Sequence, residues 1–162
     1  IDRLISLATT GGQSSQTGRD LIAKMNHAWA PRGDFTNAGR VLLLASINPP
    51  AALGPGSFHH QILERVGGTP AITTGAAYIE LDREDIRAMN PDAIILIRPT
   101  PPTSEPKHTD AMDAIATIAD LPITAAKRKR VHIISSELAL TPSPSMIEFA
   151  DELASVLADW SR

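Results

Sequence analysis

The sequence contains no cysteine among its 162 residues. Disulfide bonds, thiolate metal sites and a cysteine nucleophile are therefore excluded, while reducing and oxidising compartments both stay compatible with the composition. Aromatic residues are also scarce, at 4%, although hydrophobic residues make up 43% of the chain. The core must consequently be built mainly from alanine, leucine and isoleucine.

Long apolar runs and an excess of positive charge are missing as well. No run approaches the ~20 apolar residues that a membrane helix requires, and the N-terminus lacks the layout of a signal peptide. The net charge of -3 gives no broad basic field for nucleic acid, and the basic run at 127–130 is interpreted as a solvated turn. A chain of this length suits one compact domain.

The apolar pattern alternates between strands and helices. Helical spacing predicts helices at about 17–29, 57–66, 82–89, 110–120 and 144–160, and continuous apolar runs predict strands at 41–45, 93–97 and 131–135, with a weaker extended piece at 71–73. Apolar runs without a polar face are typical of strands that helices cover on both sides. The sequence therefore predicts an α/β fold, with an open, mostly parallel, Rossmann-like sheet and helices on both faces.

Four loops follow the predicted strands, at 46–57, 74–81, 98–108 and 135–143. In open α/β sheets, ligands collect beyond the carboxyl ends of the strands. These loops are therefore the candidate binding segments, and ordinary surface loops are the alternative interpretation.

The loop at 46–57 ends in Gly-Pro-Gly-Ser, followed by two adjacent histidines. Ser57 as a helix N-cap would bring backbone amides to an anion, but the lysine of a phosphate loop and the glycine spacing of a dinucleotide site are absent. Neighbouring helical residues such as His59 and His60 diverge by about 100°, so they cannot hold one metal ion from the same face. No metal site and no set of catalytic residues is predicted, and a core or surface position is favoured for each histidine.

Acidic residues open the helix predicted from residue 82. Asp82, Glu84 and Asp85 place negative charge at the helix start, where it offsets the helix dipole. Helix capping is therefore the default role of these three carboxylates.

Three stretches in order form a recognisable series: VLLLASINPPAALGPGSFHHQILERVGGTPAI, YIELDREDIRAMNPDAIILI and AKRKRVHIIS. They resemble the C-terminal lobe of periplasmic substrate-binding proteins with a helical backbone, which serve ABC importers for ferric siderophores, haem and vitamin B12. The resemblance covers roughly residues 1–160. It implies a binding protein outside the cytoplasm that is not an enzyme, carries no cofactor of its own and binds a metal complex.

The resemblance also implies a division of the chain. Residues 1–39 correspond to the backbone helix region and a linker, and residues 40–162 to the C-terminal α/β lobe. Because the sequence opens at helical spacing with Ile1, Leu4 and Ile5, we expect a piece of a longer chain in which an N-terminal lobe comes first. The 162 residues would then supply one wall of a ligand cleft.

Site residues follow from the same resemblance. It places a ligand-facing set of seven residues on the strand-end loops: Pro55, Gly56, Ser57, Phe58, His59, Tyr78 and Arg98. Arg98 would meet a carboxylate or an anionic chelate. Glu84 corresponds to the glutamate with which such lobes dock onto the importer's membrane subunit, and capping is the competing explanation.

Two other functions stay open at this point. The first is an α/β enzyme that binds a small anionic substrate through Arg98 and the helix start at Ser57, and the second is an interaction module that kept only the fold. If the N-terminal lobe is truly absent, a homodimer is a further expectation, because two chains would rebuild a cleft with two walls.

Overall fold

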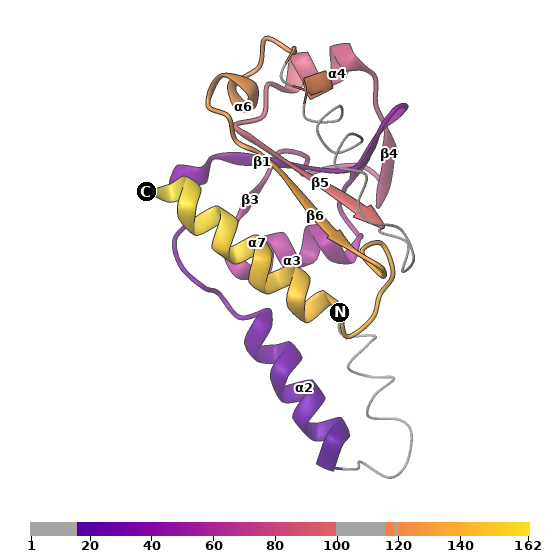
Figure 1. Cartoon of the computed structure of the whole chain (residues 1–162), viewed down its shortest axis with the longest axis vertical. Coiled ribbons are helices and arrows are strands. Elements are labelled where there is room, and N and C mark those ends of the chain that lie inside the picture. Colours follow the sequence, from indigo (N-terminus) through magenta and orange to yellow (C-terminus); the bar gives the residue numbers. More distant parts are fainter. Residues whose placement is uncertain (1–15, 100–115, 119) are drawn as a thin grey trace.

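The structure, a computed structural model, describes residues 16–99, 116–118 and 120–162 (Figure 1). Its strands are β1 (Arg40–Ile47), β2 (Pro50–Leu53), β3 (Thr69–Pro70), β4 (Tyr78–Glu80), β5 (Ala93–Pro99) and β6 (Val131–Ser136). Its helices are α2 (Gln16–Ala28), α3 (Phe58–Val66), α4 (Arg83–Met89), α6 (Thr124–Lys127) and α7 (Met146–Ser161), with a 3-10 turn, η1, at Thr36–Ala38.

The strands form one mixed sheet in the order β4-β2-β1-β5-β6, with β3 beside the start of β1. The pairs β1·β3, β1·β5 and β5·β6 are parallel, and only the edge pairs β1·β2 and β2·β4 are antiparallel. The prediction of an open, mostly parallel α/β sheet is confirmed.

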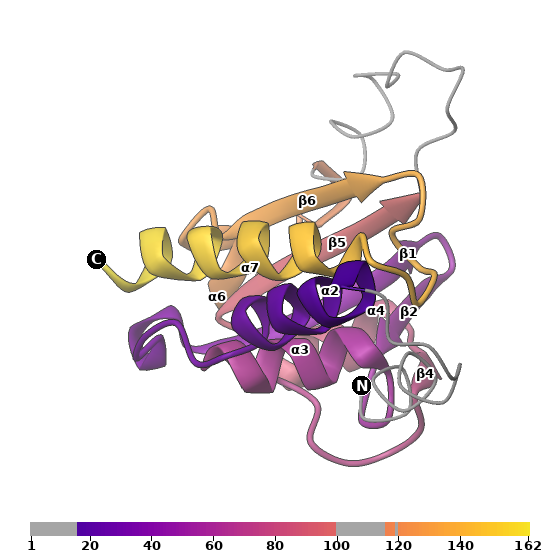
Figure 2. The same cartoon turned by 90° about the horizontal axis from the view of Figure 1, so that it is seen from below.

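Alternating residues of the central strands enter two separate cores. In β1, Val41 and Leu43 belong to one buried cluster, and Leu42 and Leu44 belong to the other. The first core is closed by α2, α3 and α7, and the second by α4, α6, Ile118, Leu121 and Ile123, so that helices lie on both faces of the sheet (Figure 2). This arrangement explains why the strands carry no polar face.

The helices α7 and α2 supply many of the buried side chains of the first core. The apolar residues of α7 recur at helical spacing and form one buried stripe, in which Met146, Leu153 and Leu157 are fully buried. Met25 and Trp29 at the end of α2 are buried in the same cluster. The Trp29 indole N–H donates to the Met146 carbonyl at 3.4 Å, which ties the end of α2 to the start of α7.

The prediction of two loops is corrected, because each of these segments contains a short strand. The loop predicted at 46–57 holds β2, and the loop predicted at 74–81 holds β4. Proline and alanine give β2 a weak strand signal, and its residues are extended because they pair with β1 and β4. Residues 71–73 are not a strand, since β3 ends at Pro70.

Other predictions fall partly or wholly outside the described residues. These are the helical opening at residues 1–8, the greater part of the loop at 98–108, and the helix at 110–120, of which 116–118 are described and helical. None of the helices in the described ranges is long and apolar enough to cross a membrane.

Candidate functional site

The Gly-Pro-Gly-Ser turn connects β2 to α3. The Ser57 amide donates to the Gly54 carbonyl at 3.1 Å, which closes the turn. The Ser57 hydroxyl accepts from the His60 amide at 3.2 Å and caps α3. Because Ser57 is buried, with 7% exposure, and its hydroxyl is already used as a cap, this hydroxyl is poorly placed to act as a nucleophile.

Glycine is required where this turn meets the segment before β4. A Cβ atom on Gly54 would stand 2.5 Å from the Ala76 carbonyl oxygen, and the Gly54 amide donates to the Ala77 carbonyl at 3.1 Å. Gly56 has a φ of +94°, a conformation that side chains disfavour. The turn therefore lies side by side with residues 75–78.

The two adjacent histidines are buried and point to different segments. The His59 ring approaches the Ala139 carbonyl at 2.6 Å through Nε2, and it packs edge-on against the Phe149 ring. The His60 ring approaches the Ile72 carbonyl at 2.9 Å, also through Nε2. The predicted divergence of the pair is confirmed. The expectation that His59 faces a ligand is corrected, because its ring is almost fully enclosed by core side chains.

Burial also changes the acidity of His59. Removing the imidazole from water disfavours its charged form, so burial lowers the pKa of His59. The hydrogen bond to Ala139 acts in the opposite direction and is the smaller effect. His59 is consequently neutral over a wider pH range than an exposed histidine.

Three large apolar side chains among the described residues are exposed, one on β4 and two on the loop after β6. Tyr78 is 55% exposed, and its backbone pairs with Leu53 at the end of β2. Leu138 and Leu140 flank Ala139 and are 44% and 36% exposed. The sequence predicted the loop at 135–143 as a candidate binding segment but did not single out these two leucines. Their alternation as apolar residues inside a predicted loop is the signal that could have found them.

Arg98 occupies a different part of the same sheet. It lies near the carboxyl end of β5 and is half-buried, two strands away from β2. Because Ile97 enters the core beneath α3, alternation along the strand places Arg98 on the opposite face. The structure thus brings together Pro55, Gly56 and Tyr78, and keeps Arg98 apart from them.

Of the three acidic residues at the start of α4, two cap the helix and the third does not. The Asp82 carboxylate accepts from the Asp85 amide at 2.7 Å, and the Asp85 carboxylate accepts from the Asp82 amide at 2.9 Å, which forms a capping box. The Glu84 side chain is 75% exposed and pairs with Arg87 at 3.1 Å. Glu84 therefore makes no cap bond and presents its carboxylate to solvent.

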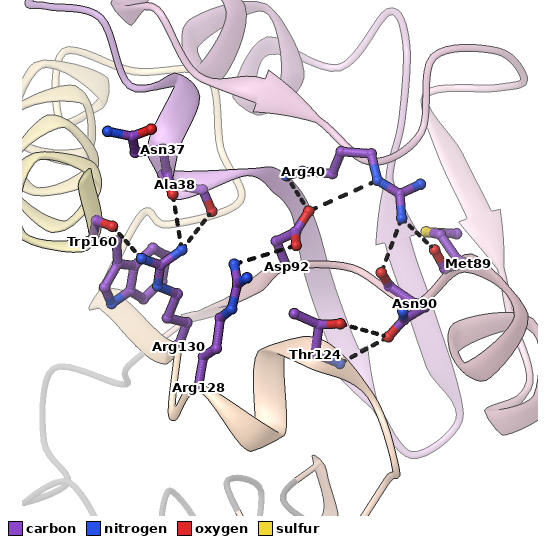
Figure 3. A network of polar contacts seen from close by, with 10 residues as sticks. All are labelled: Asn37, Ala38, Arg40, Met89, Asn90, Asp92, Thr124, Arg128, Arg130 and Trp160. Atoms are coloured by element: carbon purple, nitrogen blue, oxygen red, sulfur yellow. Dashed lines mark hydrogen bonds and ion pairs between the residues drawn. The ribbon is translucent and has the colours of Figure 1, made fainter. Parts of the chain in front are cut away.

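A polar network lies at the opposite edge of the sheet, where the strands start (Figure 3). Arg40 donates to the Met89 and Asn90 carbonyls at the end of α4, at 2.8 and 3.0 Å. Arg130 donates to the carbonyls of Asn37 and Ala38, at 3.0 and 3.2 Å, and to that of Trp160.

This network also corrects the prediction that the basic run at 127–130 is a solvated turn. Only part of that run is a solvated turn, because Arg130 is half-buried between helix ends. The Asn90 side chain accepts from the amide and hydroxyl of Thr124, at 2.8 and 3.1 Å, at the start of α6. Since these donors satisfy orphaned helix-end groups or cap a helix, the network is structural and not a catalytic centre.

A pocket of about 270 Å³ lies on the face of the sheet that carries α4. Its lining is largely apolar, with Asn48 and Arg83 as polar members, and it contains none of the residues predicted to face a ligand. Across the described ranges, no three histidine or carboxylate side chains come together in a way that could hold a metal ion. A bare metal ion therefore has no site among these residues.

The chain was compared with family models, curated proteins and solved structures. No family model and no curated protein matches the sequence. Among solved structures, the chain superposes on the periplasmic vitamin B12-binding protein of Vibrio cholerae with a TM-score of 0.66 at 13% identity, over 92% of this chain and 54% of that one. A periplasmic haem-binding protein from a Roseiflexus species gives 0.66 at 16% identity, over 96% and 60%.

An ABC-type Fe3+-hydroxamate transport protein from Saccharomonospora viridis gives a TM-score of 0.71 at 16% identity, over 94% of this chain and 54% of that one. The described chain therefore has the α/β fold found in periplasmic substrate-binding proteins of ABC importers, which confirms the resemblance seen in the sequence. More particularly, it shares this fold with a vitamin B12-binding protein, a haem-binding protein and a protein of an Fe3+-hydroxamate transport system. It spans about 54–60% of the length of these three proteins.

Proposed function

We propose that the chain is the C-terminal lobe of a solute-binding protein that works outside the cytoplasm and delivers a metal complex to an ABC importer. The observation that carries this proposal is the strand-end surface formed by the 54–57 turn and Tyr78, within a fold shared with such proteins. The lobe binds without catalysis. The enzyme alternative is weakened because the Ser57 hydroxyl is buried as a helix cap.

The chemistry of this surface favours a complexed metal over a free ion. Tyr78, Leu138 and Leu140 offer apolar area, whereas Arg98 lies two strands away from β2 and does not join the 54–57 turn and Tyr78. A chelator or macrocycle has apolar and often anionic surface and already fills the coordination sphere of its metal. Such a ligand suits a surface on which we find no metal-binding cluster among the described residues.

A second wall completes the cleft in this proposal. The chain spans about 54–60% of the length of the three solved structures with which it shares its fold. We assign the second wall to a preceding lobe of the same polypeptide, with residues 16–29 as part of the connecting backbone helix. Two chains that pair through their carboxyl edges are the alternative, and sedimentation with and without ligand separates the two arrangements.

Docking to the importer is assigned to Glu84. Its carboxylate is exposed at the start of α4, while the hydrogen-bonded caps of that helix come from Asp82 and Asp85. A carboxylate in this position can meet an arginine of a membrane subunit through two parallel hydrogen bonds.

Isothermal titration of the chain with cyanocobalamin, haemin and ferrichrome tests the proposed ligand class. Tyr78→Ala is expected to weaken the binding of the preferred compound by about tenfold, because the exposed ring offers contact area to a ligand. Lys24→Ala, an exposed change on α2, is the matched control and should leave the affinity unchanged. Equal affinities of both variants and the parent chain would refute the assigned surface.

A further inference from the structure

Three segments meet around the start of α3, although they lie far apart in the sequence. His59 contacts Ala139, which lies 80 residues later in the loop after β6, and His60 contacts Ile72, which lies 12 residues later before β4. The 54–57 turn immediately precedes both histidines. From one helical turn, the two rings therefore reach the loop that carries the exposed Leu138 and Leu140 and the segment at Ile72 that leads to β4.

Hydrogen-bond chemistry fixes how each ring makes its contact. A carbonyl oxygen only accepts, so Nε2 must carry the proton in both imidazoles. Nδ1 of His59 is buried and has no hydrogen-bond partner within the described part of the chain. Nδ1 of His60 lies 3.4 Å from the Glu64 carboxylate, one helical turn away. The His59 contact is consequently made by a neutral ring with its proton on Nε2.

We propose that His59 and His60 are a pair of positioning residues, each of which anchors one ligand-facing segment to α3 through its Nε2–H group. His59 holds the loop that carries Leu138 and Leu140, and His60 holds the segment that leads to Tyr78. This assignment rests on the proposed function only in that these segments form the ligand surface. The anchoring itself is tested without any ligand.

Hydrogen exchange of named backbone amides separates the two anchors. In the first segment, the Ala139 amide bonds to Ser136 and the Thr141 amide bonds to Leu138, at 3.2 and 2.9 Å. In the second, the Ala71 amide bonds to Val41 at 2.8 Å. The exchange rate of each amide reports how often its own segment opens.

Matched substitutions distinguish the hydrogen bond from the ring. His59→Phe keeps an aromatic ring and removes the donor, whereas His59→Gln keeps a donor near the Nε2 position. We expect His59→Phe to raise exchange at Ala139 and Thr141 by about five- to tenfold, as for the loss of one buried hydrogen bond, and His59→Gln to restore much of the protection. The exposed His27→Phe is the control.

For His60, we expect hydrogen exchange to change in its own segment and not in the segment that His59 contacts. His60→Phe should raise exchange at Ala71 and leave Ala139 unchanged, and His60→Gln should restore much of the protection. Uniform acceleration that includes the core amides of β5, or equal effects of phenylalanine and glutamine, would overturn the assignment.

The unaltered chain offers a second measurement if a variant fails to fold. Long-range proton–nitrogen correlation spectra of the imidazole rings distinguish the two ring nitrogens. A proton on Nε2 of both His59 and His60 is the expected outcome. A neutral ring with its proton on Nδ1 at either position would overturn the anchor at that position.

Discussion

Arg130 should contribute more to stability than any isolated surface charge, because its guanidinium bonds to three backbone carbonyls in two other segments of the chain. It bonds to the carbonyls of Asn37, Ala38 and Trp160, which belong to η1 and to the last turn of α7. A hydrogen bond to a charged group contributes about 1.5–3 kcal/mol when buried. Since this site is partly exposed and the three bonds share one donor group, we expect Arg130→Met to cost about 2–3 kcal/mol.

The neighbouring Arg128 provides a matched control. Its guanidinium makes one ion pair with Asp92 at 3.6 Å, and its side chain is 54% exposed. An exposed pair of this kind contributes less than about 1 kcal/mol, so Arg128→Met should be nearly neutral. Methionine keeps most of the aliphatic length in both variants, so that the comparison isolates the guanidinium.

Urea unfolding measures the difference directly. We expect a lower midpoint with an unchanged slope for Arg130→Met, together with a fall in melting temperature of about 4–12 °C. Arg130→Lys should recover less than half of the loss, because one ammonium cannot span the same carbonyls as a planar fork. Equal midpoints for Arg130→Met and Arg128→Met would refute the structural role given to the network.

Two further predictions concern His59 and Glu84. Burial lowers the pKa of His59 in the folded chain, so the unfolded chain takes up the proton first, and stability should decline as pH falls below the ordinary imidazole pKa of 6.5. Urea midpoints measured between pH 8 and pH 5.5 should show this decline. If the midpoint of a His59→Phe chain fell equally steeply with pH, His59 would not be its cause. Glu84→Lys should abolish capture of the chain by detergent-solubilised ABC importer, whereas Glu148→Lys, an exposed first-turn change on α7, should not; equal losses would contradict docking.

The central strands could be predicted because their chemistry is local. Residues 93–97 are apolar without interruption, and such a run is stable only where helices cover both faces. The amphipathic stripe of α7 likewise follows from a period of 3.6 residues. The strand β2 escaped prediction because it depends on pairing with β1 and β4, since Pro50 and Ala51 have little strand preference of their own. The edge strand β4 is only three residues long, Tyr78–Glu80, which is too short to give a clear alternating pattern.

The candidate site shows the same division. The Ser57 cap and the φ of Gly56 follow from the residue types in the turn. The divergence of His59 and His60 follows from helix geometry. Their partners do not, because a carbonyl 80 residues away carries no sequence signature, and neither does the burial that removed His59 from the ligand-facing surface.

The motif Asn90-Pro91-Asp92 illustrates how a weak sequence signal can have a specific physical cause. Asn90 adopts a φ of +44° and ends α4, a conformation that asparagine tolerates better than most residues. Its side chain also caps α6, and the Asp92 carboxylate accepts from the Arg40 amide at 2.9 Å. The motif is therefore required by the frame of the lobe and carries no information about the ligand.

The two edges of the sheet thus place different demands on the sequence. At the amino edge, arginines and Asn90 satisfy helix ends through many mutually supporting hydrogen bonds, so a substitution there alters the frame. At the carboxyl edge, the His59 ring contacts the Ala139 carbonyl between the exposed Leu138 and Leu140. A change in either leucine removes little buried contact, so we expect it to leave the frame intact.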